Sequence, residues 1–285
     1  MRNAECGSVT PHPAPRTPHF LMCRPTHYTI AYEINPWMRV ERQVRNRPAI
    51  RQWTALYHLL RRLGVRVQLL PPVKGLPALI FTANAGLVAG RTLIRSNFRY
   101  PERQGDEPVV EGHFRRQGYR VARLPRRFNF EGEGDALWVG DTLVLGFRFR
   151  SDAAAHEALA RLLKRRVLPV ELADRRFYHL DTCFAPLDAT TALWHPKAFD
   201  RYGRKVLEQL VPDLLAVSAS DARRFCCNAV AVGRHLVLHR GVSKTLTHRL
   251  VRRGFTVHEL DLSEFLKAGG SAKCLVLTLR RQESS

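Results

Sequence analysis

One cysteine near the end of the chain has the setting of a catalytic nucleophile. Cys274 follows the glycine pair Gly269-Gly270 after three residues and opens an apolar, β-type run over residues 274–279. Glycine takes backbone conformations closed to other residues and lets a ligand come close. A thiolate reacts where it is exposed and has electropositive neighbours, so the junction of flexible backbone and a strand suits one. A small cysteine buried behind a turn would give the same pattern.

A cluster of carboxylates lies near the middle of the chain. Glu131, Glu133 and Asp135 are spaced two apart, with glycines between them, just before a β-type run that starts at Ala136. A carboxylate in apolar surroundings is costly unless it is paired, and a guanidinium can pair with both of its oxygens. The spacing is consistent with a site that holds a cation, and equally with an exposed acidic turn.

A histidine and an aspartate stand two residues apart in the segment 177–184. If this segment forms a strand, as we expect, His179 and Asp181 point to the same face. A histidine beside a carboxylate suits general acid–base work, whereas a lone histidine in a strand is more often a core or surface residue. Asn84, in the small-residue segment 81–88, is a turn-former or a ligand contact, and alone it is weak evidence.

The other cysteines are better explained by packing. The six cysteines, at positions 6, 23, 183, 226, 227 and 274, contain no C-x-x-C pair and no metal-knuckle spacing, so we predict no metal site. The vicinal pair Cys226-Cys227 is the rival for the nucleophile. We interpret it as structural, with at least one thiol packed into the core. We find no export signal, so free thiols in a reducing cytoplasm are expected.

The elements that must position these residues recur along the chain. Helix-like stretches end in arginines and a glycine, as at residues 61–64, and a strand follows, which is the signal of a helix C-terminus. Similar hairpins with a glycine turn recur at residues 87–94, 137–144 and 230–237. Their offsets indicate an internal repeat of roughly 45–50 residues. The predicted helices are Pro48–Leu63, Pro108–Gln117, Asp152–Arg166, Asp200–Leu210 and Ser243–Arg253.

Five units of this kind, each read as strand, hairpin and helix, fit the chain. They could stack as an open solenoid or close into a ring of five αβ units with loops that converge on one axis, and the repeat alone does not decide between these architectures. We expect a disordered leader at residues 1–18, which holds four prolines, and a single α/β domain over residues 19–285.

Composition indicates a globular chain with a large excess of positive charge. The 285 residues are 45% hydrophobic, and 46 Lys and Arg against 25 Asp and Glu give a net charge of +21. No apolar run reaches the roughly 18 residues of a membrane span. The arginines are spread mostly as pairs at helix ends, where they complement the helix dipole. We therefore expect no nucleic-acid partner, although incidental polyanion binding stays open.

Taken together, these motifs resemble one known superfamily. The order Phe130–Asp135, His179–Asp181 and Gly-Gly-x-x-x-Cys at 269–274 is similar to the guanidino-group-modifying superfamily. This superfamily includes arginine deiminases, dimethylarginine dimethylaminohydrolases, arginine dihydrolases and amidinotransferases. The resemblance implies a five-unit αβ propeller, or pentein, with pseudo-fivefold symmetry. It extends to Leu21–Pro25, Ile34–Met38 and Thr82–Gly86.

The resemblance implies roles for the polar residues. Cys274 would be the nucleophile, His179 the general acid and base, and Glu131 a further catalytic residue. Glu131 and Asp135 match the outer acids of the family's acidic motif. This chain is one residue longer there than the E-G-G-D of deiminases, so the resemblance leaves open whether Glu131, Glu133 or Asp135 faces the substrate.

The resemblance implies four substrate-binding residues: Asp135, Asp181, Asn84 and Arg150. Asp181 matches a second acid that holds the guanidinium. Arg150 would grip a substrate α-carboxylate, with Arg148 as a close competitor. Asn84 resembles the position where dihydrolase-type members carry asparagine and deiminases carry an acid.

The resemblance therefore implies a hydrolase of C–N bonds in linear amidines. Arginine is the leading substrate, giving citrulline or ornithine plus ammonia through a covalent amidino-thioether on Cys274, with no metal or organic cofactor. The alternatives are dimethylarginine hydrolysis, an amidinotransferase, and a non-enzymatic polyanion-binding protein that kept the fold. We expect a small guanidino substrate as the partner, no association with a membrane, and a cytoplasmic location. A homo-oligomer is possible.

Overall fold

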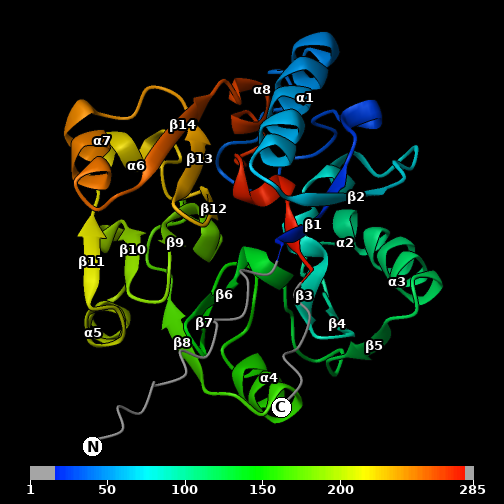
Figure 1. Ribbon diagram of the computed structural model, residues 1–285. Coiled ribbons are helices and arrows are strands. Elements are labelled where there is room, and N and C mark those ends of the chain that lie inside the picture. Colours follow the sequence, from blue (N-terminus) through cyan, green and yellow to red (C-terminus); the bar gives the residue numbers. More distant parts are fainter. Residues whose placement is uncertain (1–16, 280–285) are drawn as a thin grey trace, which may run out of the picture.

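The computed structural model describes residues 17–279, in which the named strands form five separate three-stranded sheets (Figure 1). In each sheet the central strand pairs antiparallel with one neighbour and parallel with the other. The sheets are β15-β1-β2 (Leu277–Thr278, His19–Cys23, Arg66–Leu70), β3-β4-β5 (Gly86–Ala89, Thr92–Arg95, Arg120–Arg123), β6-β7-β8 (Ala136–Val139, Thr142–Phe147, Val167–Glu171), β9-β10-β11 (Phe184–Pro186, Thr191–Trp194, Asp213–Ala216) and β12-β13-β14 (Val230–Val232, His235–His239, Thr256–Leu260).

The five predicted helices are confirmed in place, and Figure 1 shows them on the outside of the molecule. Each lies between the second and third strand of its unit. They are α1 (Asn46–Arg62), α3 (Asp106–Arg116), α4 (Ala155–Leu163), α5 (Arg201–Leu210) and α7 (Lys244–Val251), and three short helices, α2 (Pro101–Gln104), α6 (Ala219–Arg223) and α8 (Ser263–Leu266), lie in the connections. α4 is shorter than predicted because Lys164 already adopts a left-handed conformation.

Local chemistry explains where these helices begin and which face they bury. The Asp200 side chain accepts hydrogen bonds from the backbone N–H groups of Tyr202 and Gly203, and Ser243 caps α7 in the same way through Leu246. In α1, Ala49, Trp53, Leu56 and Leu60 are buried at helical spacing. The amphipathic pattern read from the sequence therefore packs these helices against their sheets.

The three predicted hairpins are also confirmed. Their turns place Gly90, Gly140 and Gly233 at φ values of 58°, 54° and 56°, the left-handed region that two-residue hairpin loops require. The order within a unit differs from the prediction. The strand that follows each helix pairs with the hairpin that precedes it, so the unit is hairpin, helix, strand. One hairpin, β9-β10, has no glycine turn and was not predicted.

The first sheet is built from the two ends of the described chain. β15 pairs antiparallel with β1, with Phe20 opposite Thr278 and Leu21 opposite Leu277, and Figure 1 shows the two strands side by side. An open solenoid keeps its first and last units apart, so this pairing does not fit that alternative. The α/β class with mixed sheets is confirmed. The strands do not form one continuous barrel.

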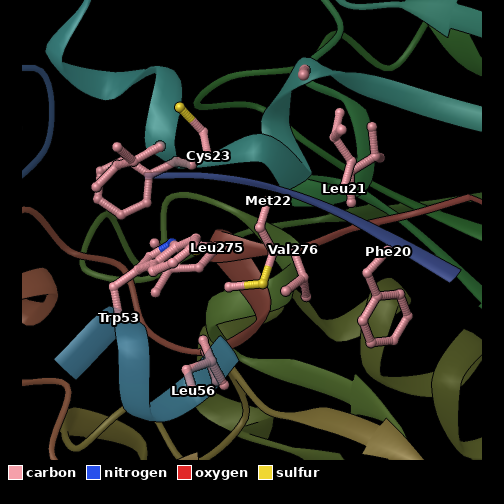
Figure 2. Packing of buried hydrophobic residues seen from close by; sticks show 14 of the residues in the cluster. Phe20, Leu21, Met22, Cys23, Trp53, Leu56, Leu275 and Val276 are labelled. Atoms are coloured by element: carbon pink, nitrogen blue, oxygen red, sulfur yellow. The ribbon is translucent and has the colours of Figure 1, made fainter. Parts of the chain in front are cut away.

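A hydrophobic cluster ties this first sheet to the segment that follows Cys274. Figure 2 shows Met22 of β1 beside Leu275 and Val276, with Trp53 and Leu56 of α1 nearby. All five side chains are almost fully buried. Burial of a side chain of this size stabilises a fold by about 1.5–3 kcal/mol, so the segment carrying the cysteine is anchored in the core.

Two predictions concern the limits of the chain. The expected leader at residues 1–18 lies mostly outside the described residues, so this leader and the single domain over 19–285 stay predictions. Within residues 17–279, no helix is long and apolar enough to cross a membrane.

Candidate active site

Each unit brings a polar side chain to the segment just before the first strand of its sheet, which is β3, β6, β9, β12 or β15. These positions are Asn84, Glu131, His179, Asn228 and Cys274, separated by 47, 48, 49 and 46 residues. Four of the segments contain a short 3₁₀ helix, at Thr82–Ala85, Gly132–Gly134, Leu180–Thr182 and Lys273–Leu275. The repeat therefore supplies the site with equivalent positions from all five units.

The predicted strand over residues 177–184 is wrong in its first part. Residues 180–182 form a 3₁₀ turn and β9 begins only at Phe184. The turn forms because both the backbone N–H and the hydroxyl of Thr182 donate to the carbonyl oxygen of His179. His179 and Asp181 therefore owe their convergence to a tight turn and not to strand alternation.

The strand predicted to open at Cys274 is also displaced. Lys273–Leu275 is a 3₁₀ turn, and β15 is the short strand Leu277–Thr278. Before this turn, Gly269 has φ of 79° and its carbonyl oxygen accepts a hydrogen bond from the Tyr178 hydroxyl at 2.8 Å. The glycine is thus needed for a left-handed backbone that links the Cys274 loop to the His179 segment.

Glu131 holds His179 in place. Nε2 of His179 lies 2.8 Å from Oε2 of Glu131, and both side chains are buried. Burial alone would raise the pKa of Glu131, but the Arg150 guanidinium and His179 outweigh it and hold that pKa well below its usual range. Glu131 is therefore an ionised carboxylate that orients the imidazole.

Arg150 is fully engaged by protein groups. Its Nη1 donates to Glu131 Oε2 at 2.9 Å and its Nη2 donates to the carbonyl oxygen of Ile34 at 2.9 Å. The guanidinium lies between the rings of Tyr100 and Tyr178, with Cζ 4.8 Å and 4.7 Å from their centroids. In this structure the arginine predicted to grip a carboxylate fixes Glu131.

The other two acids of the cluster have separate contacts. Asp135 accepts from the Leu180 backbone N–H at 3.1 Å and from the Ser151 hydroxyl at 2.6 Å. Burial raises the pKa of Asp135 to about 6, partly offset by His179 and Ser151. Glu133 pairs with Lys273 at 2.8 Å, so it anchors the turn that carries the cysteine.

The thiol of Cys274 meets the carboxyl of Asp181. The Sγ atom lies 3.2 Å from Asp181 Oδ2, and both side chains are almost fully buried. Burial raises the pKa of Asp181 to about 7, although Lys273, Cys274 and Asn228 oppose the shift. Burial and then Asp181 raise the pKa of Cys274 well above its ordinary value. These shifts favour a neutral thiol at Cys274 beside a carboxyl whose pKa lies near neutral pH.

Asn84 faces the acidic turn across a glycine. A Cβ atom on Gly134 would come within 2.3 Å of Asn84 Nδ2 and 3.3 Å of the His179 ring, so only glycine permits this approach. Within residues 17–279, Asn84 Nδ2, His179 Nδ1 and Asp181 Oδ1 are buried with no hydrogen-bond partner. Buried polar atoms are normally paired, so unpaired ones at one place mark a binding site.

Sequence reasoning missed two residues that touch this site. Asn228 bonds directly to Cys274, and the repeat spacing counted on from His179 would have found it. Arg103 is a second buried arginine, whose Nη1 donates to Asn84 Oδ1 at 3.4 Å and whose Nε donates to Asp106 at 2.7 Å. No motif singled out Arg103, because α2, which carries it, is only four residues long.

Three rival residues, Arg148 and the pair Cys226-Cys227, make none of the hydrogen bonds described above for the candidate site. Arg148 pairs with Glu171, and its side chain is 52% exposed, so it does not share the buried position of Arg150. Cys226 and Cys227 are buried with their Sγ atoms 3.9 Å apart, and they belong to a hydrophobic cluster. The prediction that this pair is packed into the core is confirmed.

Comparison with known families agrees with this geometry. Residues 24–281 match the family described as N,N dimethylarginine dimethylhydrolase, eukaryotic. The chain belongs to this family. Membership confirms the resemblance to the guanidino-group-modifying superfamily, whose related proteins include hydrolases of guanidino C–N bonds.

Relatives of this dimethylarginine dimethylhydrolase family member include two kinds of enzyme. The bifunctional arginine dihydrolase/ornithine cyclodeaminase ArgZ of Synechocystis is 44% identical over 90% of this chain and 37% of its own length. The chain thus spans little more than a third of that relative. The N(G),N(G)-dimethylarginine dimethylaminohydrolase of Mycobacterium tuberculosis is 40% identical over 93% of this chain and 87% of its own length.

Solved structures share the fold. The N-terminal domain of ArgZ bound to product, an arginine dihydrolase from cyanobacteria, superposes with a TM-score of 0.90 at 42% identity, covering 94% of this chain and 99% of that one. A dimethylarginine dimethylaminohydrolase adduct with S-methyl-L-thiocitrulline has a TM-score of 0.79 at 20% identity, with 92% and 100% covered. The second likeness speaks for the fold alone.

In this family member, the segment 34–38 lies against the loops of the site. The Asn35 amide donates to the carbonyl oxygen of Ala268 at 3.1 Å, and Trp37 Nε1 donates to the carbonyl oxygen of Arg176 at 2.7 Å. Ile34 receives Arg150, as described above. One segment thus contacts the loop before Cys274, the loop before His179 and the arginine that fixes Glu131.

Within residues 17–279, no group of three or more histidine, cysteine or acidic side chains is arranged to hold a metal ion.

Proposed function

We propose that the protein is a cysteine-dependent hydrolase that attacks the guanidinium carbon of arginine, or of a related guanidino compound, through a covalent amidino-thioether on Cys274. The observation that carries this proposal is the buried contact between the Cys274 thiol and the Asp181 carboxyl. A cation that pairs with Asp181 arrives next to the nucleophile. The conjugated plane of a guanidinium also matches the bidentate geometry of carboxylates.

Substrate binding would activate the thiol. A guanidinium held by Asp181, with Asp135 as the second carboxylate, offsets the burial that raises both of their pKa values. The same positive charge favours the thiolate of Cys274, whose pKa is raised well above its ordinary value in the unliganded site by burial and by Asp181. The nucleophile thus forms when substrate is present.

His179 would then move protons. The thiolate attacks the central carbon, and His179, held by Glu131, takes up the proton lost by the thiol and delivers it to the leaving nitrogen, so that ammonia departs and the thioether remains. The neutral imidazole next takes a proton from water, whose oxygen attacks the same carbon and releases Cys274. One such cycle converts arginine and water into citrulline and ammonia. A second cycle on citrulline gives ornithine, ammonia and carbon dioxide.

An arginine would bind the α-carboxylate of an amino-acid substrate. Arg150 remains our prediction for this role, and both of its terminal nitrogens would have to be shared with the Glu131 and Ile34 contacts. Arg103 is the further candidate, because it reaches Asn84 from a buried position. Asn84 itself, beside Gly134 and His179, would contact the guanidinium. Its presence favours the dihydrolase reaction, in which two successive hydrolyses give ornithine.

The second candidate activity is hydrolysis of dimethylarginine. It is supported by the matched family and by the relative from Mycobacterium tuberculosis. The dihydrolase outcome is supported by ArgZ and by AgrE of Nostoc, which is 46% identical over 90% of this chain. An amidinotransferase would need an amine acceptor for turnover and comes third.

The proposal also includes the architecture and the cellular location of the protein. We propose that the five sheets form the closed ring of a five-unit propeller with pseudo-fivefold symmetry, as the pairing of β15 with β1 would allow. The five described cysteines are free, which suits a cytoplasmic enzyme. The oligomeric state stays open.

The test is mass spectrometry of the purified protein with arginine and, separately, with asymmetric dimethylarginine. Ornithine with two ammonia per arginine supports a dihydrolase, citrulline alone supports a deiminase, and dimethylamine from the second substrate supports the other candidate. A mass adduct on the Cys274 peptide supports the covalent step. No product and no adduct from either substrate would overturn the proposal and leave the polyanion-binding alternative in first place.

A further inference from the structure

The side chain of Asn228 makes four hydrogen bonds at the foot of the Cys274 turn. It is fully buried in the connection between α6 and β12. Its Oδ1 accepts from the backbone N–H groups of Ser271 at 2.9 Å and Cys274 at 3.1 Å. Its Nδ2 donates to the carbonyl oxygen of Asp181 at 3.1 Å and to Cys274 Sγ at 3.1 Å.

These four contacts fix the amide in one orientation. A flip that exchanges Oδ1 and Nδ2 would set a donor against the two N–H groups and an acceptor against the Asp181 carbonyl. A buried donor or acceptor left unpaired in this way destabilises the fold. The orientation that remains points an N–H at the cysteine sulfur.

The backbone reinforces this link from the other side. The N–H of Lys273 donates to the carbonyl oxygen of Asn228 at 3.2 Å. One residue thus receives the backbone N–H groups of Ser271, Lys273 and Cys274, which hold the turn carrying the thiol. Asn228 therefore holds the Cys274 turn together with the Glu133–Lys273 ion pair.

Among the described residues, no lysine, arginine or histidine side chain hydrogen-bonds to Cys274 Sγ. Lys273 is next to the cysteine in sequence, but its amine is bonded to Glu133 Oε2 and to the carbonyl oxygen of Val276. His179 is bonded to Glu131. Within residues 17–279, the Asn228 amide is the side-chain nitrogen that hydrogen-bonds to Sγ. A hydrogen bond to the charged form of a group favours that form.

We propose that Asn228 is a positioning residue of this active site, which orients the Cys274 turn through Oδ1 and stabilises the thiolate through Nδ2. The inference rests on the proposed function, in which Cys274 is the nucleophile. It assigns the fifth repeat a role in the site, since Asn228 is the polar residue of that unit in the position before the first hairpin strand.

The two halves of the amide can be separated experimentally. Asn228→Asp keeps an oxygen for the Ser271 and Cys274 N–H groups, removes the donor to Sγ and adds a negative charge beside it. Alkylation of Cys274 by iodoacetamide, followed on its peptide by mass spectrometry across pH, reports thiolate formation without any substrate. We expect the midpoint of the rate–pH profile to rise by about one unit or more.

Turnover gives the second measurement. If the mass-spectrometry test identifies a substrate, Asn228→Asp is expected to lower kcat by about 10²-fold while KM changes by less than about threefold. Asn228 contacts the Cys274 thiol and the backbone of Asp181, and not the carboxylates proposed to bind the substrate. If no substrate is found, the alkylation profile still tests the positioning role, so the two proposals fail separately.

Asn97 is the matched control. It is also buried, donating from Nδ2 to the carbonyl oxygens of Leu124 and Phe128 and accepting from Arg95 at Oδ1, away from Cys274. Asn97→Asp is expected to lower the melting temperature without moving the alkylation profile. Asn228→Ser, with a smaller change in charge, covers the case in which Asn228→Asp does not fold, and should shift the profile in the same direction. A parent-like profile in a folded Asn228 variant overturns the proposal.

Discussion

The two ends of the hairpin strands differ in almost every physical property. At the end where β3, β6 and β9 begin, the site holds buried acids, a buried histidine and unpaired polar atoms. At the opposite end, the hairpin turns meet the starts of the third strands, as where Arg120 donates to the carbonyl oxygen of Arg91. That end carries exposed cations: Arg66, Arg91, Arg120, Lys164, Arg165, Arg166, Arg234 and Arg252.

A large hollow, of about 1660 Å³ and lined by residues of all five units, extends from the hairpin turns at the opposite end to the Cys274 turn. Arg66, Arg120 and Arg165 are among its lining residues, together with the Glu133–Lys273 ion pair. Its exposed arginines keep their hydration, whereas Glu131, Asp135 and Asp181 are taken out of water at the site. Net charge therefore says little about where this protein does chemistry, and burial of a few acids says much.

The comparison predicts its largest effect at the nucleophile. Cys274→Ser replaces a thiol that can become a thiolate with a hydroxyl of much higher pKa, so we expect kcat with the identified guanidino substrate to fall by more than about 10³-fold. Cys226→Ser and Cys227→Ser, in the rival pair, should leave kcat within about twofold of the parent because neither thiol contacts the site. Product formation measured by mass spectrometry decides; activity surviving in Cys274→Ser would sink the assignment.

The next effect concerns the carboxylate that holds the histidine. Glu131→Gln keeps the shape but removes the negative charge beside His179 and Arg150, and we expect kcat to drop by about 10²- to 10³-fold. Glu264 is a comparable buried glutamate, paired with Arg45 and Lys267 far along the chain from these acids. Glu264→Gln should change the melting temperature, whereas its kcat should stay close to that of the parent. Equal losses of kcat in the two variants would contradict a special role for Glu131.

Asp181 should link activity and stability to pH with opposite signs. Its pKa is about 7 in the fold and near 3.8 in an unfolded chain, so the folded state holds its proton more tightly. Stability from this group is therefore lost as pH rises from about 4 to about 7. Substrate binding needs the carboxylate, so kcat/KM should fall as pH drops through about 7.

Asp181→Asn separates these two consequences. The variant should lose most of its activity yet melt about 3 °C or more above the parent at pH 8, with the difference shrinking at pH 5, because the amide removes the burial of a charge. Thermal melts and initial rates at both pH values give the answer. A variant that is less stable than the parent at pH 8 would show that Asp181 is a structural anchor.

The smallest effect is expected at the opposite end. The double change Arg165→Gln and Arg166→Gln removes two exposed charges without touching a buried group, and kcat/KM should stay within about twofold of the parent. Elution from an anionic polymer column should move to lower salt, since each phosphate-like contact contributes to the salt dependence. A large loss of activity would break the division between the two ends.

Patterns that repeat could be predicted from the sequence, and contacts between distant segments could not. Three hairpins could be predicted from their turn glycines, Gly90, Gly140 and Gly233, because the left-handed backbone conformation of these turns favours glycine. The β9-β10 hairpin gave no such signal, since its loop is fixed by Asp188, whose Oδ1 accepts from Thr190 and Thr191. A carboxylate cap of this kind looks like any polar loop.

The site followed the same rule. Cys274, His179 and Glu131 were visible as residue types in apolar surroundings, but their partners are set by the fold. Arg150, predicted to bind a substrate α-carboxylate, is bonded to Glu131. Asn228 was not predicted, although it directly follows the pair Cys226-Cys227. The 3₁₀ turns at Leu180–Thr182 and Lys273–Leu275 escaped because their β-prone residues also suit a strand, and only packing decides between the two.

The pairing of β1 with β15 has a consequence for the timing of assembly. The paired residues Phe20 and Thr278 are 258 positions apart, so a growing chain exposes an open edge on β1 until residue 278 has been made. Contacts this distant form slowly. Cys274 stands three residues before β15, the strand that closes this edge, so a chain that stops short of β15 leaves the first sheet unfinished. In order of synthesis, the sheet next to the Cys274 turn is therefore the last of the five described sheets to gain all its strands.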